Sequence, residues 1–263
     1  MKKDISRFAT EDRPLHCSGL GTLLKCPWRA AMQFLYEDQD VGSEAGDTGS
    51  ATHVAVAELH RGKEVADCIA AMKDRLGKYP KADLQEAAAL FLSYAADTRN
   101  RGAEVVLIEK EVAFQISPAE EDKTQAPIQV VGTLDQVRKV NGIYKLFDLK
   151  TSKKDGVDLL NQHVFQIAAY CIGASIFLNT KVQPGALICP RKYKTKDPST
   201  APVFYHFTWT FDDIEQILYG VRHAVAKIRA GEYWHVPGDY CTWCPAKTPD
   251  FCLPKLKQCL CEK

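Results

Sequence analysis

Two carboxylates and a lysine in the middle of the chain have the residue types and the spacing that metal-ion chemistry requires. Asp148 and Lys150 stand two residues apart in IYKLFDLKT, a segment whose other residues favour a β-strand. Asp135 lies in a preceding strand-like run, IQVVGTLDQVRKV, and Asn141-Gly142 separates the two runs. Asn-Gly between alternating apolar residues predicts a hairpin with a type I′ turn, because that turn needs positive φ at both positions. The sequence therefore predicts a hairpin that carries all three side chains.

The register of this hairpin decides whether the two carboxylates meet. If the loop has two residues, Asp135 lies directly opposite Asp148, and Lys150 shares their face. Like charges directly opposite each other are destabilising, but a divalent cation between their oxygens turns the repulsion into attraction. The alternative is a solvated face on which Lys150 pairs with a carboxylate. The pattern thus leaves two interpretations, a metal site and an exposed ion pair.

The order GTLDQV and then DLK resembles the PD-(D/E)XK nuclease superfamily, in particular its RecB-like branch. The resemblance implies that Asp135 and Asp148 bind Mg²⁺ or Mn²⁺, and that Lys150 orients or activates the attacking water. It also implies that the main-chain carbonyl of Leu149 is a metal ligand. The implied fold class is α/β: a restriction-endonuclease-like core with a mixed central sheet flanked by helices.

Two further motifs extend this resemblance. In TGSATHVAVAEL, His53 fills the place of a metal-binding histidine on a glycine-led helix, although a lone helical histidine is more often structural or exposed. In FQIAAYCIGA, Gln166 and Tyr170 share a helix face and match a Q-x-x-x-Y motif that contacts DNA. The alternative there is a core tyrosine with a glutamine at the rim. Relatives also carry a glutamate near Glu109 or Glu111, and the sequence does not distinguish these two.

The chain has ten cysteines, and its amino terminus lacks the apolar segment of a secretory signal. Reduced thiols or metal ligands are therefore expected in place of disulfides. Cys68, Cys171 and Cys189 stand singly in apolar contexts, which predicts that they lie in the core.

Four other cysteines, near the two ends of the chain, resemble the iron–sulfur variety of these nucleases, seen in the AddB type and in CRISPR-associated RecB-like exonucleases. The implied ligands of a [4Fe–4S] cluster are Cys26, Cys241, Cys244 and Cys252. Thiolates are soft ligands suited to such a cluster, which would join segments 17–36 and 232–261. The gap before the last ligand is longer than usual in the family, so Cys259 and Cys261 offer substitutes. Zinc held by the same four cysteines is the alternative.

The remaining patterns predict the elements that position these residues. Helices are expected from residue 18, from Pro27, and over 51–62, 81–98, 157–179 and 210–231. Strands are expected over 104–116, 128–140, 143–151, 185–190 and 203–211. The Gly- and Ser-rich stretch 41–50 predicts a loop. Thr210 and Asp213 predict a capping box at the start of the last helix, and Gly231 predicts its end.

Composition and charge set broad limits. The 263 residues are 46% hydrophobic and 25% charged, as in an ordinary globular protein, and we expect a single nuclease domain over 1–263. No apolar run reaches the length of a membrane span, so a cytoplasmic protein without a membrane partner is expected. The net charge of +1 gives no argument for nucleic acid. Local candidates for DNA contacts are Arg191 and Lys192 in RKYKTK, and Trp234.

The sequence thus predicts a metal-dependent DNA exonuclease that acts on DNA ends or single strands in recombination, repair or phage DNA metabolism. DNA is the expected partner, together with a second copy of the chain or a recombination or repair protein. The alternative is a non-catalytic DNA-binding or assembly subunit with the same fold. The presence of Asp135, Asp148 and Lys150 argues against that alternative, since such a subunit does not need this arrangement of charges.

Overall fold

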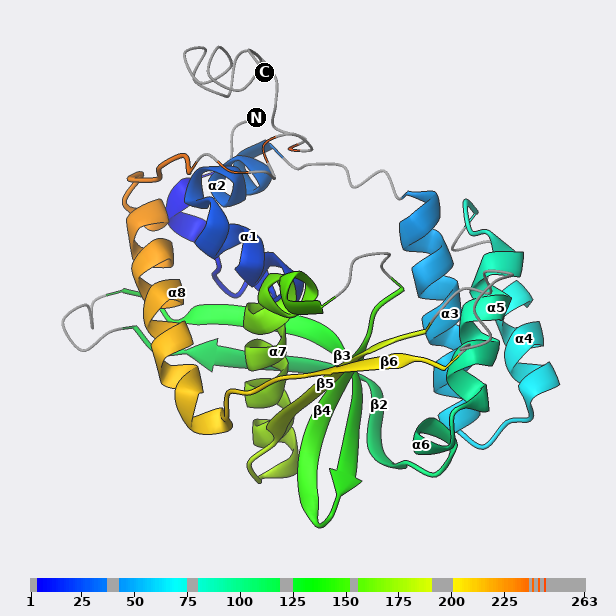
Figure 1. The fold of residues 1–263 in the computed structure, drawn as a ribbon. Coiled ribbons are helices and arrows are strands. Elements are labelled where there is room, and N and C mark those ends of the chain that lie inside the picture. Colours follow the sequence, from blue (N-terminus) through cyan, green and yellow to red (C-terminus); the bar gives the residue numbers. More distant parts are fainter. Residues whose placement is uncertain are drawn as a thin grey trace. The chain divides into compact units, whose positions relative to one another are not determined.

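The chain forms two compact units, each built from segments that are distant in the sequence (Figure 1). The computed structural model describes residues 4–36, 43–74, 80–118, 125–151, 156–190 and 201–236, and the single residues 238, 241 and 244. The terminal unit comprises Met1–Asp40, Ala113–Val131 and Ile214–Lys263, and the central unit comprises Val41–Val112 and Gly132–Asp213. Two long strands, β2 (Glu104–Ile116) and β3 (Ile128–Val140), contribute residues to both units.

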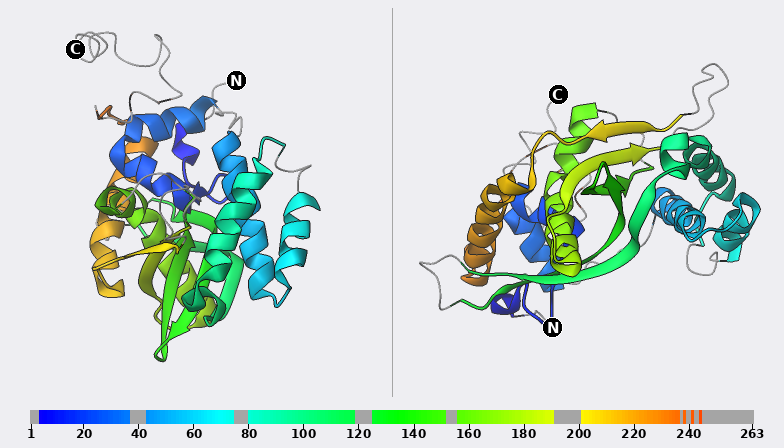
Figure 2. Two further views of the ribbon diagram at one scale, coloured as in Figure 1. Left: turned by 45° about the vertical axis from the view of Figure 1, so that its right-hand side comes forward. Right: turned by 90° about the horizontal axis from the view of Figure 1, so that it is seen from below.

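The terminal unit is mainly helical. Its elements are η1 (Ile5–Arg7), β1 (Leu15–His16), η2 (Cys17–Gly19), α1 (Leu20–Lys25), α2 (Pro27–Tyr36) and α8 (Ile214–Arg229). Helix α8 packs against α1 and α2, and β1 pairs in parallel with the start of β3 (Figure 2). Arg229, at the end of α8, donates to the carbonyls of Phe8, Ala9, Ala126 and Pro127, so one guanidinium joins the amino-terminal turn to the segment before β3.

The central unit is a mixed sheet with helices packed on it. Its helices are α3 (Glu44–His60), α4 (Val65–Asp74), α5 (Leu84–Ala96), α6 (Thr98–Arg101), α7 (Gly156–Leu178) and the short η4 (Phe211–Asp213). Its further strands are β4 (Ile143–Leu149), β5 (Gln183–Cys189) and β6 (Val203–His206). Strand β4 pairs antiparallel with β3 and parallel with β5, and β5 pairs antiparallel with β6. Helices α3, α4 and α5 share one core with Phe147, Leu149, Ala186 and Ile188, while α7 contacts β4 and β5.

The predicted hairpin between β3 and β4 is confirmed. Gln136 pairs with Phe147 and Val140 with Ile143, which is the register that a two-residue loop requires. Asn141 and Gly142 have φ of 51° and 80°, the left-handed values of a type I′ turn.

Several other predictions hold, two are wrong, and one helix was missed. Helix α2 begins at Pro27 as expected, and the Asp213 carboxylate accepts the N–H of Thr210 at 2.7 Å in the predicted capping box. The stretch predicted as a loop over 41–50 is wrong from Glu44 onward, where α3 begins. Ser43 accepts the N–H of Gly46 and so caps this helix despite its Gly- and Ser-rich start. Helix α4 was not predicted, and β6 ends at His206, short of its predicted end.

Within the parts of the chain that the structure describes, no helix combines the length and the apolar character that crossing a bilayer takes.

Candidate active site

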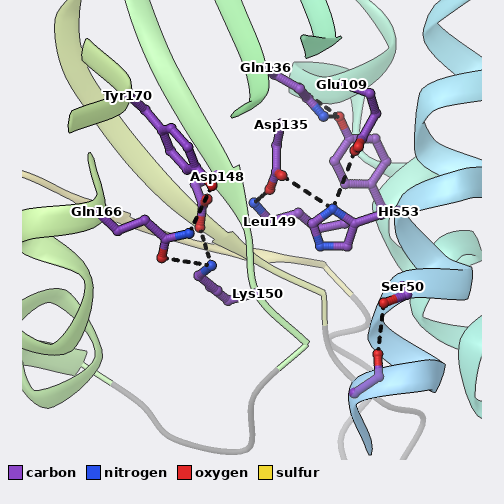
Figure 3. Close-up of polar contacts among 12 residues, drawn as sticks. Ser50, His53, Glu109, Asp135, Gln136, Asp148, Leu149, Lys150, Gln166 and Tyr170 are labelled. Atoms are coloured by element: carbon purple, nitrogen blue, oxygen red, sulfur yellow. Dashed lines mark hydrogen bonds and ion pairs between the residues drawn. The ribbon is translucent and has the colours of Figure 1, made fainter. Parts of the chain in front are cut away.

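Three elements of the central unit bring one histidine and two carboxylates together (Figure 3). His53 comes from α3, Glu109 from β2 and Asp135 from β3. His53 Nδ1 lies 3.3 Å from Asp135 Oδ1 and 3.4 Å from Glu109 Oε1. The three ligand atoms all lie within 4.8 Å of one another, close enough to share one metal ion.

The backbone of β2 explains why Glu109 is the glutamate that reaches this group. Glu109 has φ of 45°, and no other residue within the described strands has a positive φ. A non-glycine residue in this region is uncommon, and such strain persists where the surrounding structure enforces it, often at functional sites. Glu111 is exposed to solvent and is not part of the group. The structure therefore distinguishes the two glutamates that the sequence left open.

The hairpin holds the other predicted residues beside this group. Gln136 pairs with Phe147, and the next step of the same register places Asp135 opposite Asp148. Asp135 Oδ2 accepts the N–H of Leu149 at 2.6 Å, while the side chain of Leu149 lies in the core. Asp148 Oδ2 forms an ion pair with Lys150 Nζ at 2.8 Å. Asp135 and Asp148 are 8% and 1% exposed, so the interpretation as a solvated face does not apply.

Burial and neighbouring charges move the pKa values of these groups in different directions. Burial would lower the pKa of His53, but Asp135 and Glu109 together raise it well above its ordinary value. Burial would raise the pKa of Asp135, but His53, Lys150 and the Leu149 N–H lower it. For Asp148, burial and the nearby charge of Asp135 outweigh Lys150 and raise the pKa to about 6. Burial would lower the pKa of Lys150, but Asp148 and Asp135 raise it, so its ammonium stays charged at neutral pH.

This donor set fits a hard divalent cation. It offers carboxylate oxygens and one imidazole nitrogen, the ligand types that suit Mg²⁺ and Mn²⁺. Asp148 Oδ2 is fully buried and, apart from its ion pair with Lys150, accepts no hydrogen bond from the described residues. A buried carboxylate oxygen needs a cationic partner, which the Lys150 ammonium supplies here and a bound metal ion would reinforce. His53, Glu109 and Asp135 could therefore hold the ion, with Asp148 adjacent to them.

The residues of the predicted Q-x-x-x-Y motif connect to the lysine. Lys150 Nζ donates to Gln166 Oε1 at 3.4 Å, and Gln166 Nε2 donates to the hydroxyl of Tyr170 at 3.2 Å (Figure 3). Tyr170 is buried and Gln166 is half-buried. Gln166 also contacts His163, one turn earlier on α7, which the sequence reasoning did not select.

The three core cysteines are placed as predicted, because Cys68, Cys171 and Cys189 are all buried. Burial raises the pKa of the Cys171 thiol above its ordinary value, as expected for an inert core cysteine.

Three of the four predicted cluster ligands belong to the terminal unit and are described. Cys26 is buried at the end of α1, and Cys241 and Cys244 are half-buried. Trp28 donates its N–H to the carbonyl of Trp234 at 3.0 Å, so the segment after α8 lies against the start of α2. Among the described residues, these cysteines do not form a group tight enough for a single metal ion. The predictions for Cys252, Cys259, Cys261, Arg191 and Lys192 lie outside the described residues.

Sequence reasoning also missed a polar network in the core of the central unit. Arg138 is 3% exposed and donates to Gln136 Oε1, to the Tyr94 hydroxyl at 2.9 Å and to Asn100 Oδ1 at 2.9 Å. Tyr94 in turn lies 2.6 Å from His60 Nε2. The network joins α3 and α5 to the strand that carries Asp135. Its only signal in the sequence is Gln136 and Arg138 at alternate positions of β3.

Comparisons with known proteins identify the family and the fold. A family model of the PD-(D/E)XK nuclease superfamily matches residues 14–249. Among solved structures, the "Putative exonuclease" from Eubacterium rectale has a TM-score of 0.57 and 13% identity, over 95% of this chain and 93% of that chain. The structure of SSO0001 has a TM-score of 0.43 and 16% identity, over 89% of this chain and 86% of that chain. None of the curated proteins matches the chain. The similarity to the Eubacterium rectale structure shows the fold alone, and the expected α/β class with a mixed, helix-flanked sheet is confirmed.

Proposed function

Because the chain belongs to the PD-(D/E)XK nuclease superfamily, we propose that it is a divalent-metal-dependent DNA exonuclease of the RecB-like branch, acting on DNA ends or single strands. The observation that carries the proposal is the group of half-buried His53 and Glu109 with buried Asp135, next to the ion pair of Asp148 and Lys150.

Each residue of the site has a distinct role in this proposal. His53, Glu109 and Asp135 hold Mg²⁺ or Mn²⁺, and Asp148 and the carbonyl of Leu149 complete the ligand set. When bound, the ion lowers the pKa of a coordinated water and offsets negative charge on the phosphate.

Lys150 acts as a charged hydrogen-bond donor. Since Asp148 and Asp135 raise its pKa, its ammonium orients the attacking water and stabilises developing charge without taking the proton itself. The attacking water would give its proton to bulk water or to an oxygen of the scissile phosphate.

Contacts with DNA are assigned to Gln166 at this site, to the basic segment RKYKTK and to Trp234. Gln166 lies beside Lys150 and offers an amide to a phosphate or a base edge. Arg191 and Lys192 supply contacts to the DNA backbone, which are independent of sequence and weaken with salt. Trp234 is 44% exposed and offers a ring on which a base can stack.

We also propose that Cys26, Cys241, Cys244 and Cys252 hold a [4Fe–4S] cluster in the terminal unit. The contact between Trp28 and Trp234 supports this, because it ties the segment after Cys26 to the segment before Cys241. Zinc held by the same four cysteines remains the alternative, and metal analysis separates the two.

The cluster is tested by iron and sulfide assays on anaerobically purified protein. Cys26→Ala should lose iron and melt at a lower temperature, because a metal site that binds only the folded chain adds to its stability. Cys259→Ala and Cys261→Ala are the matched controls and should keep the full iron content. A full cluster in Cys26→Ala, or stoichiometric zinc without sulfide in the wild type, would contradict the assignment.

The nuclease activity is tested with matched linear and covalently closed circular DNA in Mg²⁺ or Mn²⁺. An exonuclease degrades the linear DNA progressively from its ends, leaves the closed circle intact, and stops when EDTA is added. Nicking of the closed circle would show endonuclease action instead. Salt-sensitive DNA binding without cleavage in either metal would favour the non-catalytic subunit.

A further inference from the structure

His163 on α7 and the proposed catalytic lysine contact the same side chain, Gln166. His163 Nδ1 is 2.9 Å from Gln166 Oε1, and the same oxygen accepts from Lys150 Nζ at 3.4 Å. Gln166 Nε2 donates to the Tyr170 hydroxyl at 3.2 Å. The two ends of this amide are therefore used in different ways: its oxygen accepts from Lys150 and lies beside His163 Nδ1, and its nitrogen donates to a hydroxyl.

The orientation of the Gln166 amide matters for Lys150. If the amide were turned over, its NH₂ group would face the Lys150 ammonium, and two donors would point at each other. With the oxygen facing Lys150, the ammonium donates to Gln166 and forms its ion pair with Asp148 Oδ2 at 2.8 Å. A lysine ammonium has three donors, so these two partners restrict the directions that are left for its other N–H groups.

His163 favours this orientation only if Nδ1 carries a proton. A bare Nδ1 would bring a lone pair against the carbonyl oxygen of Gln166, whereas Nδ1–H donates to it. Lys150 and these α7 residues all belong to the central unit. His163, Gln166 and Tyr170 lie on successive turns of α7. The helix thus presents a donor, an amide and a hydroxyl in one row.

From this geometry we infer that His163 is a positioning residue for the proposed nuclease reaction. It donates its Nδ1–H to Gln166, which locks the amide and so aims the Lys150 ammonium. This inference rests on the proposed function, but the tautomer and the hydrogen bond to Gln166 do not depend on activity. His163 acts through Gln166 and makes no contact with the reacting phosphate.

The first experiment measures kcat and KM for cleavage of a labelled linear duplex in Mn²⁺. His163→Ala should lower kcat about 10-fold, the factor expected when one hydrogen bond no longer orders a catalytic group. The KM for DNA and the affinity for Mn²⁺ should stay within about twofold of wild type. His163→Asn should restore most of the rate, because its amide nitrogen can occupy the place of Nδ1. Asn161→Ala, on an exposed part of the same helix, is the control and should match the wild type.

A double-mutant cycle tests whether His163 acts through Gln166. In a Gln166→Ala background, adding His163→Ala should cause no further loss of kcat. The inference is overturned if His163→Ala has the wild-type rate, or if it causes the same loss in both backgrounds. It is also overturned if His163→Asn is as defective as His163→Ala, or if only KM changes, since either result would mean that the ring itself contacts DNA or takes part in the chemistry.

A spectroscopic measurement separates this inference from the proposed function. Long-range ¹H–¹⁵N correlation spectra of the metal-free protein should show neutral His163 protonated at Nδ1, and Gln166→Ala should weaken that preference. A neutral form protonated at Nε2 in the wild type would contradict the inference, whether or not the protein cleaves DNA. If His163→Ala does not fold, this spectrum and His163→Asn still decide the question. A protein with the Nδ1–H tautomer but no nuclease activity would refute the proposed function and leave the hydrogen bond established.

Discussion

Replacing Asp148 by asparagine removes a buried charge and keeps the shape of the side chain. Burial and Asp135 raise the pKa of Asp148 from 3.8 to about 6, although Lys150 opposes them. Ionising this carboxyl in the folded protein at pH 8 therefore costs about 3 kcal/mol, at 1.36 kcal/mol for each pKa unit. Asp148→Asn avoids this cost. We expect the metal-free variant to be more stable than the wild type by about 3 kcal/mol at pH 8.

The pH dependence of this difference has a definite sign. Between about pH 4 and pH 6 the folded protein keeps the Asp148 proton that the unfolded chain releases. The stability that Asp148 contributes therefore falls as the pH rises through this window. The advantage of the variant should be about 1 kcal/mol at pH 4.5 and complete above about pH 7.

The assay is thermal and urea unfolding in EDTA at pH 4.5 and pH 8, where about 3 kcal/mol corresponds to a rise in Tm of roughly 6–12 °C. Asp135→Asn is the matched control. Because His53 and Lys150 lower the pKa of Asp135 against the effect of burial, losing its charge should destabilise the protein. Saturating Mn²⁺ should stabilise the wild type and narrow or reverse its gap to Asp148→Asn. A metal-free Asp148→Asn variant less stable than the wild type at pH 8, or equally stabilised at both pH values, would refute the reasoning.

Three further predictions concern the metal, helix α3 and the buried network. Mn²⁺ binding should release close to one proton near pH 7 and should tighten as the pH rises, because Asp135 and Glu109 raise the pKa of His53 against the effect of burial. Calorimetry in buffers of different ionisation enthalpy measures this release. Mn²⁺ binding that does not change with pH would contradict the prediction. A Cβ at Gly49 would lie 2.9 Å from Thr151 Oγ1, so Gly49→Ala should forfeit the usual helix gain of about 1 kcal/mol in urea unfolding. Thr151→Ala should restore that gain, and an equal gain in both backgrounds would show that the contact is harmless. Arg138→Met should destabilise the protein by about 3 kcal/mol, because the buried acceptors of Arg138 lose their donor. It should also raise the pKa of His60 from about 4, because the nearby Arg138 charge adds to burial in lowering that pKa. NMR titration measures the His60 pKa, and an unchanged value would contradict the network.

Local sequence signals predicted the hairpin, because the turn and the register depend on residues that are neighbours in the chain. Asn141-Gly142 specifies a type I′ turn, and that turn alone places Asp135 opposite Asp148. The resemblance to the nuclease superfamily then supplied His53, which lies on helix α3, outside the hairpin. Its meeting with Asp135 cannot be worked out from spacing, since it depends on how α3 packs on the sheet.

The choice between Glu109 and Glu111 could not be made from the sequence. In a regular strand these residues are two apart and share a face, so alternation gives them the same environment. The positive φ at Glu109 breaks this equivalence, and nothing in EVVLIEKEVAFQI marks the position where it occurs.

The start of α3 was missed for a different reason. Gly and Ser were taken as signs of a loop, whereas Ser43 caps the helix and Gly49 allows its close approach to Thr151. Composition describes the average behaviour of these residues, and here capping and packing decide.

The rate of metal-dependent DNA cleavage by Glu109→Gln and by Glu111→Gln tests the central claim most directly. Each change replaces one carboxylate of the same strand by an isosteric amide, but only Glu109 belongs to the group with His53 and Asp135. If this group is the metal centre of a nuclease, Glu109→Gln should lose at least roughly 100-fold in rate, whereas Glu111→Gln should cleave like the wild type. Wild-type cleavage by Glu109→Gln, or an equal loss in both variants, would contradict the account.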